Sequence, residues 1–179
     1  ICGGGALFDM GIYHIAQVMY LLGAPEVETM SGKLYQETDM DMKRKSDSGY
    51  NVEELSLGFV RLSDNISLDI IESWAIHLNQ FEGSSIIGSK AGIRLDPFSF
   101  HSTFCDLDMD STLNLESMER RRHFLNKDED AYDSSQHHWI AALQGRVDLL
   151  PTAEVALKTM LIQEGIYLSH EKGREVTAK

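Results

Sequence analysis

Asp9 and Tyr13 are the residues whose types and spacing most directly suggest chemistry. They stand four positions apart, and residues at i and i+4 are neighbours on one face of an α-helix. A carboxylate beside a phenol can orient a hydroxyl group and exchange its proton. The alternative is a carboxylate near a helix N-terminus beside an aromatic ring that fills a groove. Taken without any family relationship, the two residues favour that alternative.

A single apolar helix is predicted to carry both residues. It runs from Ala6 to Leu22, because this stretch holds no proline and Gly23-Ala24-Pro25 supplies a stop. On a wheel of about 100° per residue, its expected core stripe is Phe8, Ile12, Ile15, Met19 and Leu22. Its polar stripe is Asp9, Tyr13, Gln17 and Tyr20. A helix this apolar should be largely buried, so the polar stripe must face solvent, a cleft or polar partners.

Alternating apolar residues predict strands in the middle of the chain. The clearest signal is a hairpin, in which Asp64-Asn65 separates the alternating runs 55–59 and 66–70. The second run can continue as far as Ile76, which would place His77 at the end of the strand. The other expected strands are 27–36, 84–87 and 92–95, and the expected loops are the charged stretches 37–51 and 119–133.

Two helices are expected to close the chain. Ser134 or Ser135 can cap the first, which ends near Leu143. The second runs from Pro151 to Gly173, and its expected buried stripe is Leu157, Met160, Leu161 and Leu168. These elements predict an α+β fold with an open, mostly antiparallel or mixed sheet and with helices packed on one face. The other sheet face would then be available for dimerisation.

Composition limits the classes of partner. A net charge of −12 and 42% hydrophobic residues are typical of a globular protein, and the acidic charge argues against nucleic-acid or anionic membrane surfaces. No stretch reaches the ~18 apolar residues of a membrane span. Cys2 and Cys105 form no C-x-x-C pair, so we expect a reducing, cytoplasmic location. No metal site is predicted, because His137-His138 has no second ligand pair at zinc spacing.

The segment from Gly3 to Gly23 resembles the start of the second domain in the Gfo/Idh/MocA family, which includes glucose–fructose oxidoreductase, inositol dehydrogenase and dihydrodiol dehydrogenase. The likeness rests on a glycine run, then Asp-x-Gly-x-Tyr on a helix that ends at Leu-Gly. It continues through Val52-Glu53-Glu54, Glu72-Ser73-Trp74 and the closing helices. The resemblance implies a fold like the C-terminal domain of glyceraldehyde-3-phosphate dehydrogenase.

The resemblance also implies a division of labour. Residues 1–179 would form a single substrate-binding and dimerisation domain, and a Rossmann domain, absent from this chain, would bind NAD or NADP and supply a lysine. The chain itself has no G-x-G-x-x-G motif. Asp9 falls on the family's active-site aspartate, and Tyr13 falls on its catalytic His or Tyr position. Free tyrosine has a pKa near 10, so Tyr13 would need a neighbouring cation to act as a base.

The remaining candidate site residues are less specific. Gly4 and Gly5 are expected to approach the nicotinamide, with a flexible joint as the alternative. The candidate contacts to a carbohydrate-like substrate are His14, Gln17, Trp74 and His77. For His14 a packed, hydrogen-bonded histidine is the stronger interpretation, and Trp74 is more often a core or interface residue.

The function implied is the catalytic half of an NAD(P)-dependent oxidoreductase acting on a secondary alcohol of a sugar, polyol or cyclic diol. We expect this chain alone to be inactive in hydride transfer. Two alternatives stay open: an NAD-dependent glycosidase of the same superfamily, and a non-catalytic dimerisation or binding module.

Overall fold

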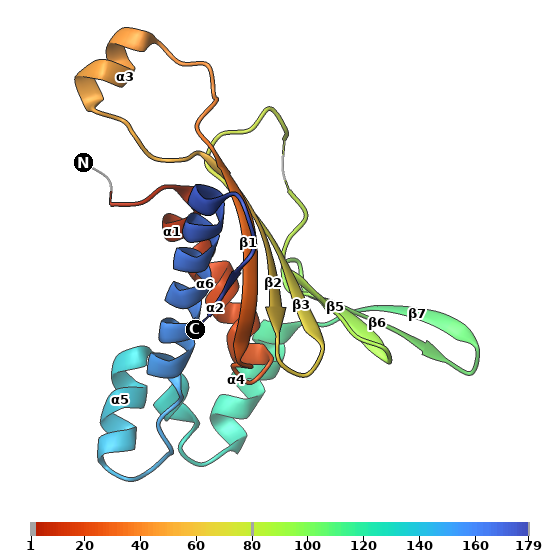
Figure 1. Ribbon diagram of the computed structural model, residues 1–179. Helices are drawn as coiled ribbons and strands as arrows, with labels where there is room; N and C mark the ends of the chain where they lie inside the picture. The colour runs from red at the N-terminus through yellow and green to blue at the C-terminus, as the bar shows by residue number, and fades with distance from the viewer. Residues whose placement is uncertain (1–2, 80, 179) are drawn as a thin grey trace. The chain divides into compact units, whose positions relative to one another are not determined.

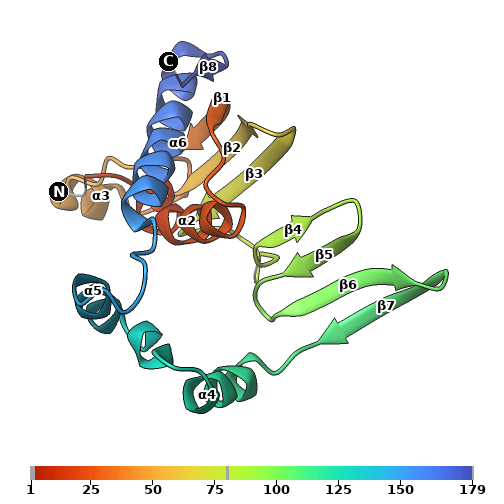
Figure 2. The ribbon, with the colours of Figure 1, turned by 90° about the horizontal axis from the view of Figure 1, so that it is seen from below.

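The computed structural model describes residues 3–79 and 81–178. The chain folds into two compact units (Figures 1 and 2). The first comprises residues 1–81 together with 152–179, and the second comprises residues 82–151. Each unit contains its own four-stranded antiparallel sheet, so the predicted α+β, antiparallel class is confirmed.

The sheet of the first unit has the order β3-β2-β1-β8. Its strands are β1 (Val27–Tyr35), β2 (Leu55–Leu62), β3 (Ile66–Ser73) and β8 (Val176–Thr177). The predicted hairpin is present as β2–β3, and Asp64 and Asn65 both have φ of 60°, the left-handed conformation that tight hairpin turns need. The strand predicted to reach Ile76 ends at Ser73, so His77 lies in a bend beyond the strand.

Three helices cover one face of this sheet: α1 (Ala6–Asp9), α2 (Gly11–Leu21) and α6 (Thr152–Lys172) (Figure 1). The core between helices and sheet includes Leu7, Ile15, Met19, Met30 and Ile166. A Cβ on Gly32 or Gly58 would come within 2.5–2.6 Å of the Ile166 side chain. The two glycines therefore allow α6 to lie close against β1 and β2.

The predicted continuous helix 6–22 is interrupted at Met10. Gly11 packs closely at this point, because a Cβ there would meet Leu7 at 3.1 Å and Glu72 at 3.2 Å. Ile15 and Met19 are buried as predicted, whereas Ile12 is 37% exposed. The interruption shifts the buried face, which also includes Leu7, Gly11 and Val18.

The predicted buried stripe of α6 is wrong. Leu157, Met160, Leu161 and Leu168 are all exposed. The helix instead buries Val155, Ile162 and Ile166 together with polar residues that find partners. Lys158 Nζ donates to Ala24 O at 2.5 Å and Gln163 Nε2 donates to Leu7 O at 2.7 Å. Apolar periodicity misidentified the face because hydrogen bonds offset the cost of burying these polar groups.

The stretch 37–51, expected to be a loop, contains the short helix α3 (Met42–Ser48). Asp41 Oδ1 caps it by accepting a hydrogen bond from Arg44 N–H at 2.8 Å. Gly49, with φ of 65°, ends it. The charged sequence of this helix buries no residue, which is why hydrophobic periodicity gave no signal.

The sheet of the second unit joins its strands in chain order. They are β4 (Ser85–Ile87), β5 (Ala91–Arg94), β6 (Ser99–Phe104) and β7 (Leu107–Thr112). The register places Ile86, Ile93 and Phe100 in one cross-strand row. Phe104 pairs with Leu107 and Ser102 with Met109 on the same face, while the opposite face carries the His101–Asp110 pair. The sheet therefore has one apolar and one polar face.

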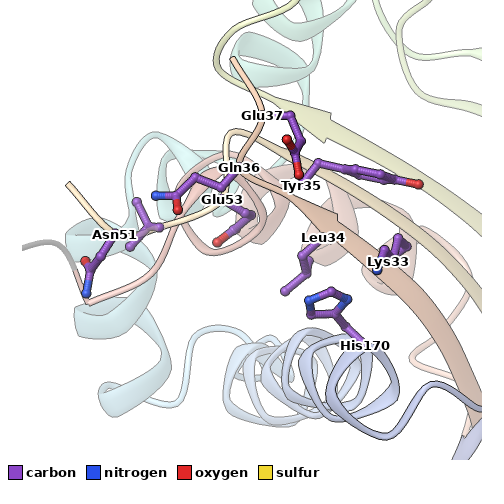
Figure 3. A pocket seen from close by; sticks show the side chains of 9 residues that line it. Lys33, Leu34, Tyr35, Gln36, Glu37, Asn51, Glu53 and His170 are labelled. Carbon is purple, nitrogen blue, oxygen red and sulfur yellow. The ribbon is translucent and has the colours of Figure 1, made fainter. Parts of the chain in front are cut away.

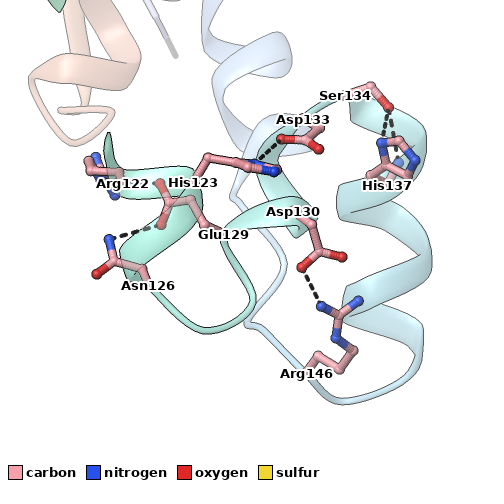
Figure 4. Close-up of polar contacts among 9 residues, drawn as sticks. All are labelled: Arg122, His123, Asn126, Glu129, Asp130, Asp133, Ser134, His137 and Arg146. Atoms are coloured by element: carbon pink, nitrogen blue, oxygen red, sulfur yellow. Dashed lines mark hydrogen bonds and ion pairs between the residues drawn. The ribbon is translucent and has the colours of Figure 1, made fainter. Parts of the chain in front are cut away.

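Helices α4 (Leu115–Leu125), η1 (Glu129–Tyr132) and α5 (Ser135–Leu143) follow in this unit. The stretch 119–133, expected to be a loop, is therefore mostly helical. Arg146 ties this region together by donating to Asp128 at 2.8 Å and to Asp130 at 2.6 Å. Figure 4 shows the bond to Asp130. The guanidinium hydrogen bond holds the pKa of the Asp130 carboxyl below its ordinary value. Ser134 caps α5 as predicted.

Candidate functional site

Asp9 and Trp74 come together at the end of β3. Asp9 is the last residue of α1, and Trp74 follows the end of β3. The Trp74 indole Nε1–H donates a hydrogen bond to Asp9 Oδ2 at 3.0 Å. This bond fixes one oxygen of the carboxylate. The second oxygen can accept a hydrogen bond from a hydroxyl group. Asp9 is thereby held as an oriented acceptor.

Tyr13 lies in the first turn of α2, just past the interruption at Met10. Its side chain is strongly exposed, at 69%. Its backbone N–H donates to Met10 O at 3.1 Å, a tight bond three residues back that follows the interruption between α1 and α2. The phenol is thus open to a molecule that approaches this end of the helix.

His14 is bound to a buried carboxylate. Its Nδ1 lies 2.9 and 3.1 Å from the two carboxylate oxygens of Glu72. Glu72 is only 6% exposed, whereas the His14 side chain is about half exposed. Burial raises the pKa of the Glu72 carboxyl above its ordinary value, and the hydrogen bond with His14 opposes part of that rise. The contact anchors α2 to β3.

The raised pKa of Glu72 leads to a pH-dependent stability. When the pKa of a carboxyl is higher in the folded than in the unfolded chain, its contribution to stability is complete at pH values below the unfolded-state pKa. That contribution is lost as pH rises through the folded-state pKa. Glu72→Gln keeps a polar side chain without the charge. We expect wild type to lose stability relative to this variant as pH rises from 4 to 8, measured by urea unfolding. Glu28→Gln, at an exposed position, is the control. If the stability difference between wild type and Glu72→Gln changes with pH no more than that between wild type and Glu28→Gln, the expectation is contradicted.

Glu53 organises the N-terminal glycine segment, although sequence reasoning assigned it no role beyond leading into a strand. Glu53 Oε1 accepts from Leu7 N–H at 3.1 Å, and its backbone oxygen accepts from Ala6 N–H at 3.2 Å. Glu53 Oε2 accepts from the Tyr167 hydroxyl at 2.5 Å. Burial and this hydrogen bond raise the pKa of the Tyr167 phenol above its ordinary value. The buried carboxylate thus sets where α1 begins.

Other residues of the chain pack closely against the two glycines predicted to approach a cofactor. Gly5 is buried, and its N–H points to Tyr167 Oη at 3.4 Å. A Cβ on Gly5 would overlap the backbone oxygen and carboxylate of Glu53. A Cβ on Gly4 would meet the Phe8 side chain at 2.6 Å. Close packing therefore gives a reason for glycine at both positions that is independent of any ligand.

The two other predicted contacts are surface residues. Gln17 is exposed on α2, and His77 is exposed in the bend after β3.

Within residues 3–79 and 81–178, no three His, Cys, Asp or Glu side chains are placed to hold a metal ion. Across the same residues, no helix is both long enough and apolar enough to cross a membrane.

Comparison with known proteins gives a consistent picture. Residues 2–178 match the Gfo/Idh/MocA family described as "Oxidoreductase family, C-terminal alpha/beta domain". D-glucoside 3-dehydrogenase of Escherichia coli (strain K12) is 24% identical over 181 residues, which cover 97% of this chain and 49% of that protein.

Solved structures share the fold. Levoglucosan dehydrogenase in complex with NADH superposes with a TM-score of 0.73 at 16% identity, over 100% of this chain and 51% of that one. Aldose-aldose oxidoreductase from Caulobacter crescentus, complexed with glycerol, gives 0.61 at 17% identity, over 98% and 48%. The chain therefore spans about half the length of the proteins it resembles.

Proposed function

The chain belongs to the Gfo/Idh/MocA oxidoreductase family, and from this we propose that it supplies the substrate-binding half of an NAD(P)-dependent oxidoreductase. The proposed substrate is a secondary alcohol of a sugar, polyol or cyclic diol. The observation that carries the proposal is the hydrogen bond from Trp74 to Asp9, which orients a carboxylate four residues before Tyr13, whose side chain is exposed.

In the proposed reaction, Asp9 orients the substrate, and the reacting hydroxyl passes its proton to the Tyr13 phenolate. A bound nicotinamide would take the hydride from the same carbon. Tyrosine accepts a proton near neutral pH only when a cation stabilises the phenolate. We propose that a lysine from outside these residues provides that cation.

The described residues fit only a small part of a dinucleotide. The chain has no G-x-G-x-x-G motif, and the Gly5 N–H is already directed to Tyr167. Gly4 and the exposed Gly3 are the backbone positions left to approach a nicotinamide. We therefore propose that a further domain binds most of the cofactor. The exposed apolar face of α6, with Leu157, Leu161 and Leu168, is typical of a surface that another domain covers.

The proposed substrate class is supported by the names of the relatives. One is a D-glucoside 3-dehydrogenase, and levoglucosan dehydrogenase was also solved with NADH and L-sorbose. These molecules carry several hydroxyls, and half-exposed polar or aromatic side chains suit them. We propose Trp74, His14, Gln17 and His77 as substrate contacts, of which Trp74 touches Asp9 directly.

The test is to incubate the full-length protein with NAD⁺ or NADP⁺ and a panel of sugars, polyols and cyclic diols, and to follow reduced nicotinamide by absorbance. Substrate-dependent reduction supports the proposal. Cleavage of a nitrophenyl glycoside without net cofactor reduction would instead identify an NAD-dependent glycosidase. No turnover with any substrate would leave a binding or dimerisation module.

We also propose that the sheet face opposite the helices joins a second copy of the protein. Leu57 and Ile71 are 37% and 54% exposed there, beside Phe59, and they line a shallow hollow of about 570 Å³. Leu57→Asp in the full-length protein should lower its mass in solution to that of a monomer. Met42→Asp, at a strongly exposed position on α3 outside the sheet, serves as control. An unchanged mass for Leu57→Asp would contradict this interface.

A further inference from the structure

A histidine can activate a hydroxyl where one of its ring nitrogens lies within hydrogen-bond distance of that hydroxyl. His170 lines a groove of about 410 Å³ in the first unit (Figure 3), but the other lining residues, 33–37 and 51–53, include no serine, threonine or cysteine. His101, on the sheet of the second unit, has such a neighbour, because its Nε2 lies 2.9 Å from Ser99 Oγ.

His101 is also held by a carboxylate. Its Nδ1 lies 2.6 Å from Asp110 Oδ1, and the two residues are paired directly across β6 and β7. Ser99 and His101 stand two positions apart on β6, so their side chains share one face of the sheet. The strand register therefore brings Ser99, His101 and Asp110 together in one row of hydrogen bonds on the polar face.

The direction of these hydrogen bonds follows from the chemistry of the three groups. An ionised carboxylate only accepts hydrogen bonds, so His101 Nδ1 carries the proton and donates to Asp110. The neutral imidazole then has its acceptor at Nε2, and the Ser99 hydroxyl donates to it. A serine hydroxyl that donates to an imidazole oriented by a carboxylate is the arrangement that activates serine for attack on a carbonyl carbon.

The residues beside this row leave room for a substrate. Gly92 pairs with His101 across β5 and β6, and it has no side chain to cover the imidazole, which is about half exposed. Arg94 pairs with Ser99 on the same face and is exposed, so its positive charge can stabilise an oxyanion that forms beside Ser99. Ile87 pairs with Gly92, and its strongly exposed side chain offers an apolar contact to an acyl group.

We propose that Ser99, His101 and Asp110 form an acyl-transfer site for carboxylic esters with a small acyl group. The Ser99 oxygen bonds to the carbonyl carbon while its proton passes to His101 Nε2, and Asp110 stabilises the imidazolium that results. The bond from that carbon to the alcohol oxygen then breaks, and the alcohol leaves with the proton from His101. Water repeats the two steps on the acyl-serine and releases the carboxylic acid. The site needs no nicotinamide, so it is independent of the reaction proposed for Asp9 and Tyr13.

The experiment treats the native full-length protein with a fluorophosphonate, a probe that loses fluoride and forms a stable bond to a serine activated in this way. Peptide mass spectrometry should find the probe on Ser99. With p-nitrophenyl acetate as substrate, Ser99→Ala and His101→Gln should each release nitrophenolate at least about 10-fold more slowly than wild type, because each removes part of the proton transfer. An unchanged midpoint of thermal unfolding shows that such a loss comes from chemistry.

Thr103→Ala is the matched control. Thr103 lies on the same face of β6, but its hydroxyl donates directly to Asp108 at 3.2 Å, with no imidazole between them. Its replacement should leave the rate within about twofold of wild type. The proposal is overturned if the probe is found on Thr103 as often as on Ser99, or if Ser99→Ala releases nitrophenolate as fast as wild type.

Discussion

Replacing Tyr13 by phenylalanine in the full-length protein is expected to lower kcat by about 10²–10⁴-fold, the usual contribution of a proton-transfer group. KM should change by less than about threefold, because the ring remains and only the proton acceptor is removed. The effect should be confined to chemistry, since the Tyr13 side chain is 69% exposed and contributes little to packing. Steady-state kinetics together with thermal unfolding of both proteins measure the two parts of this expectation.

Tyr20→Phe is the matched control. Tyr20 lies on the same helix and is also exposed, at 45%, but it follows Asp9 by eleven residues, about three helical turns. Its replacement should leave kcat within about twofold of wild type, as expected for a surface change away from the site. If Tyr13→Phe behaves like Tyr20→Phe, then Tyr13 does not transfer the proton, and a non-catalytic module becomes the better description.

The part of the site that the sequence predicts is local. Asp9 and Tyr13 are linked by helical spacing, which one stretch of sequence determines. The bond between Trp74 and Asp9 joins residues 65 positions apart, and it depends on where β3 ends. The pairing of His14 with Glu72 depends on the same strand register. Such contacts follow from tertiary packing, and a single sequence without an alignment carries no signal for them.

In the fold, too, local features could be predicted from the sequence and tertiary contacts could not. Asp64-Asn65 predicts the β2–β3 turn because few residues adopt two successive positive φ angles. The buried face of α6 could not be predicted from apolar spacing, since Lys158 and Gln163 are buried through hydrogen bonds to the main chain of Ala24 and Leu7. Glu53 was likewise overlooked, because a carboxylate before a strand gives no sign that it will cap a helix 46 residues away in sequence.

The second large effect is expected from Gly5→Ala, because this change acts on the packing that positions Asp9. A Cβ at residue 5 would overlap the backbone oxygen of Glu53, which cannot move without disturbing its bond from Ala6 N–H. Overpacking against a fixed backbone costs typically 1–3 kcal/mol and occasionally more. We expect a loss of about 3 kcal/mol in the free energy of unfolding, measured by urea denaturation.

Gly3→Ala is the matched control, since no atom lies within 4 Å of a Cβ placed there. It should leave stability within about 0.5 kcal/mol of wild type. Gly4→Ala should fall between the two, because rotation of the Phe8 ring relieves the contact at 2.6 Å but leaves the Phe8 Cβ at 2.9 Å. Where Gly5→Ala still folds, kcat should fall by about 10²-fold, since a shift of about 1 Å in Asp9 is enough to misalign a reacting hydroxyl. Equal stability and equal kcat for Gly5→Ala and Gly3→Ala would show that the Glu53 contact does not position the helix that carries Asp9.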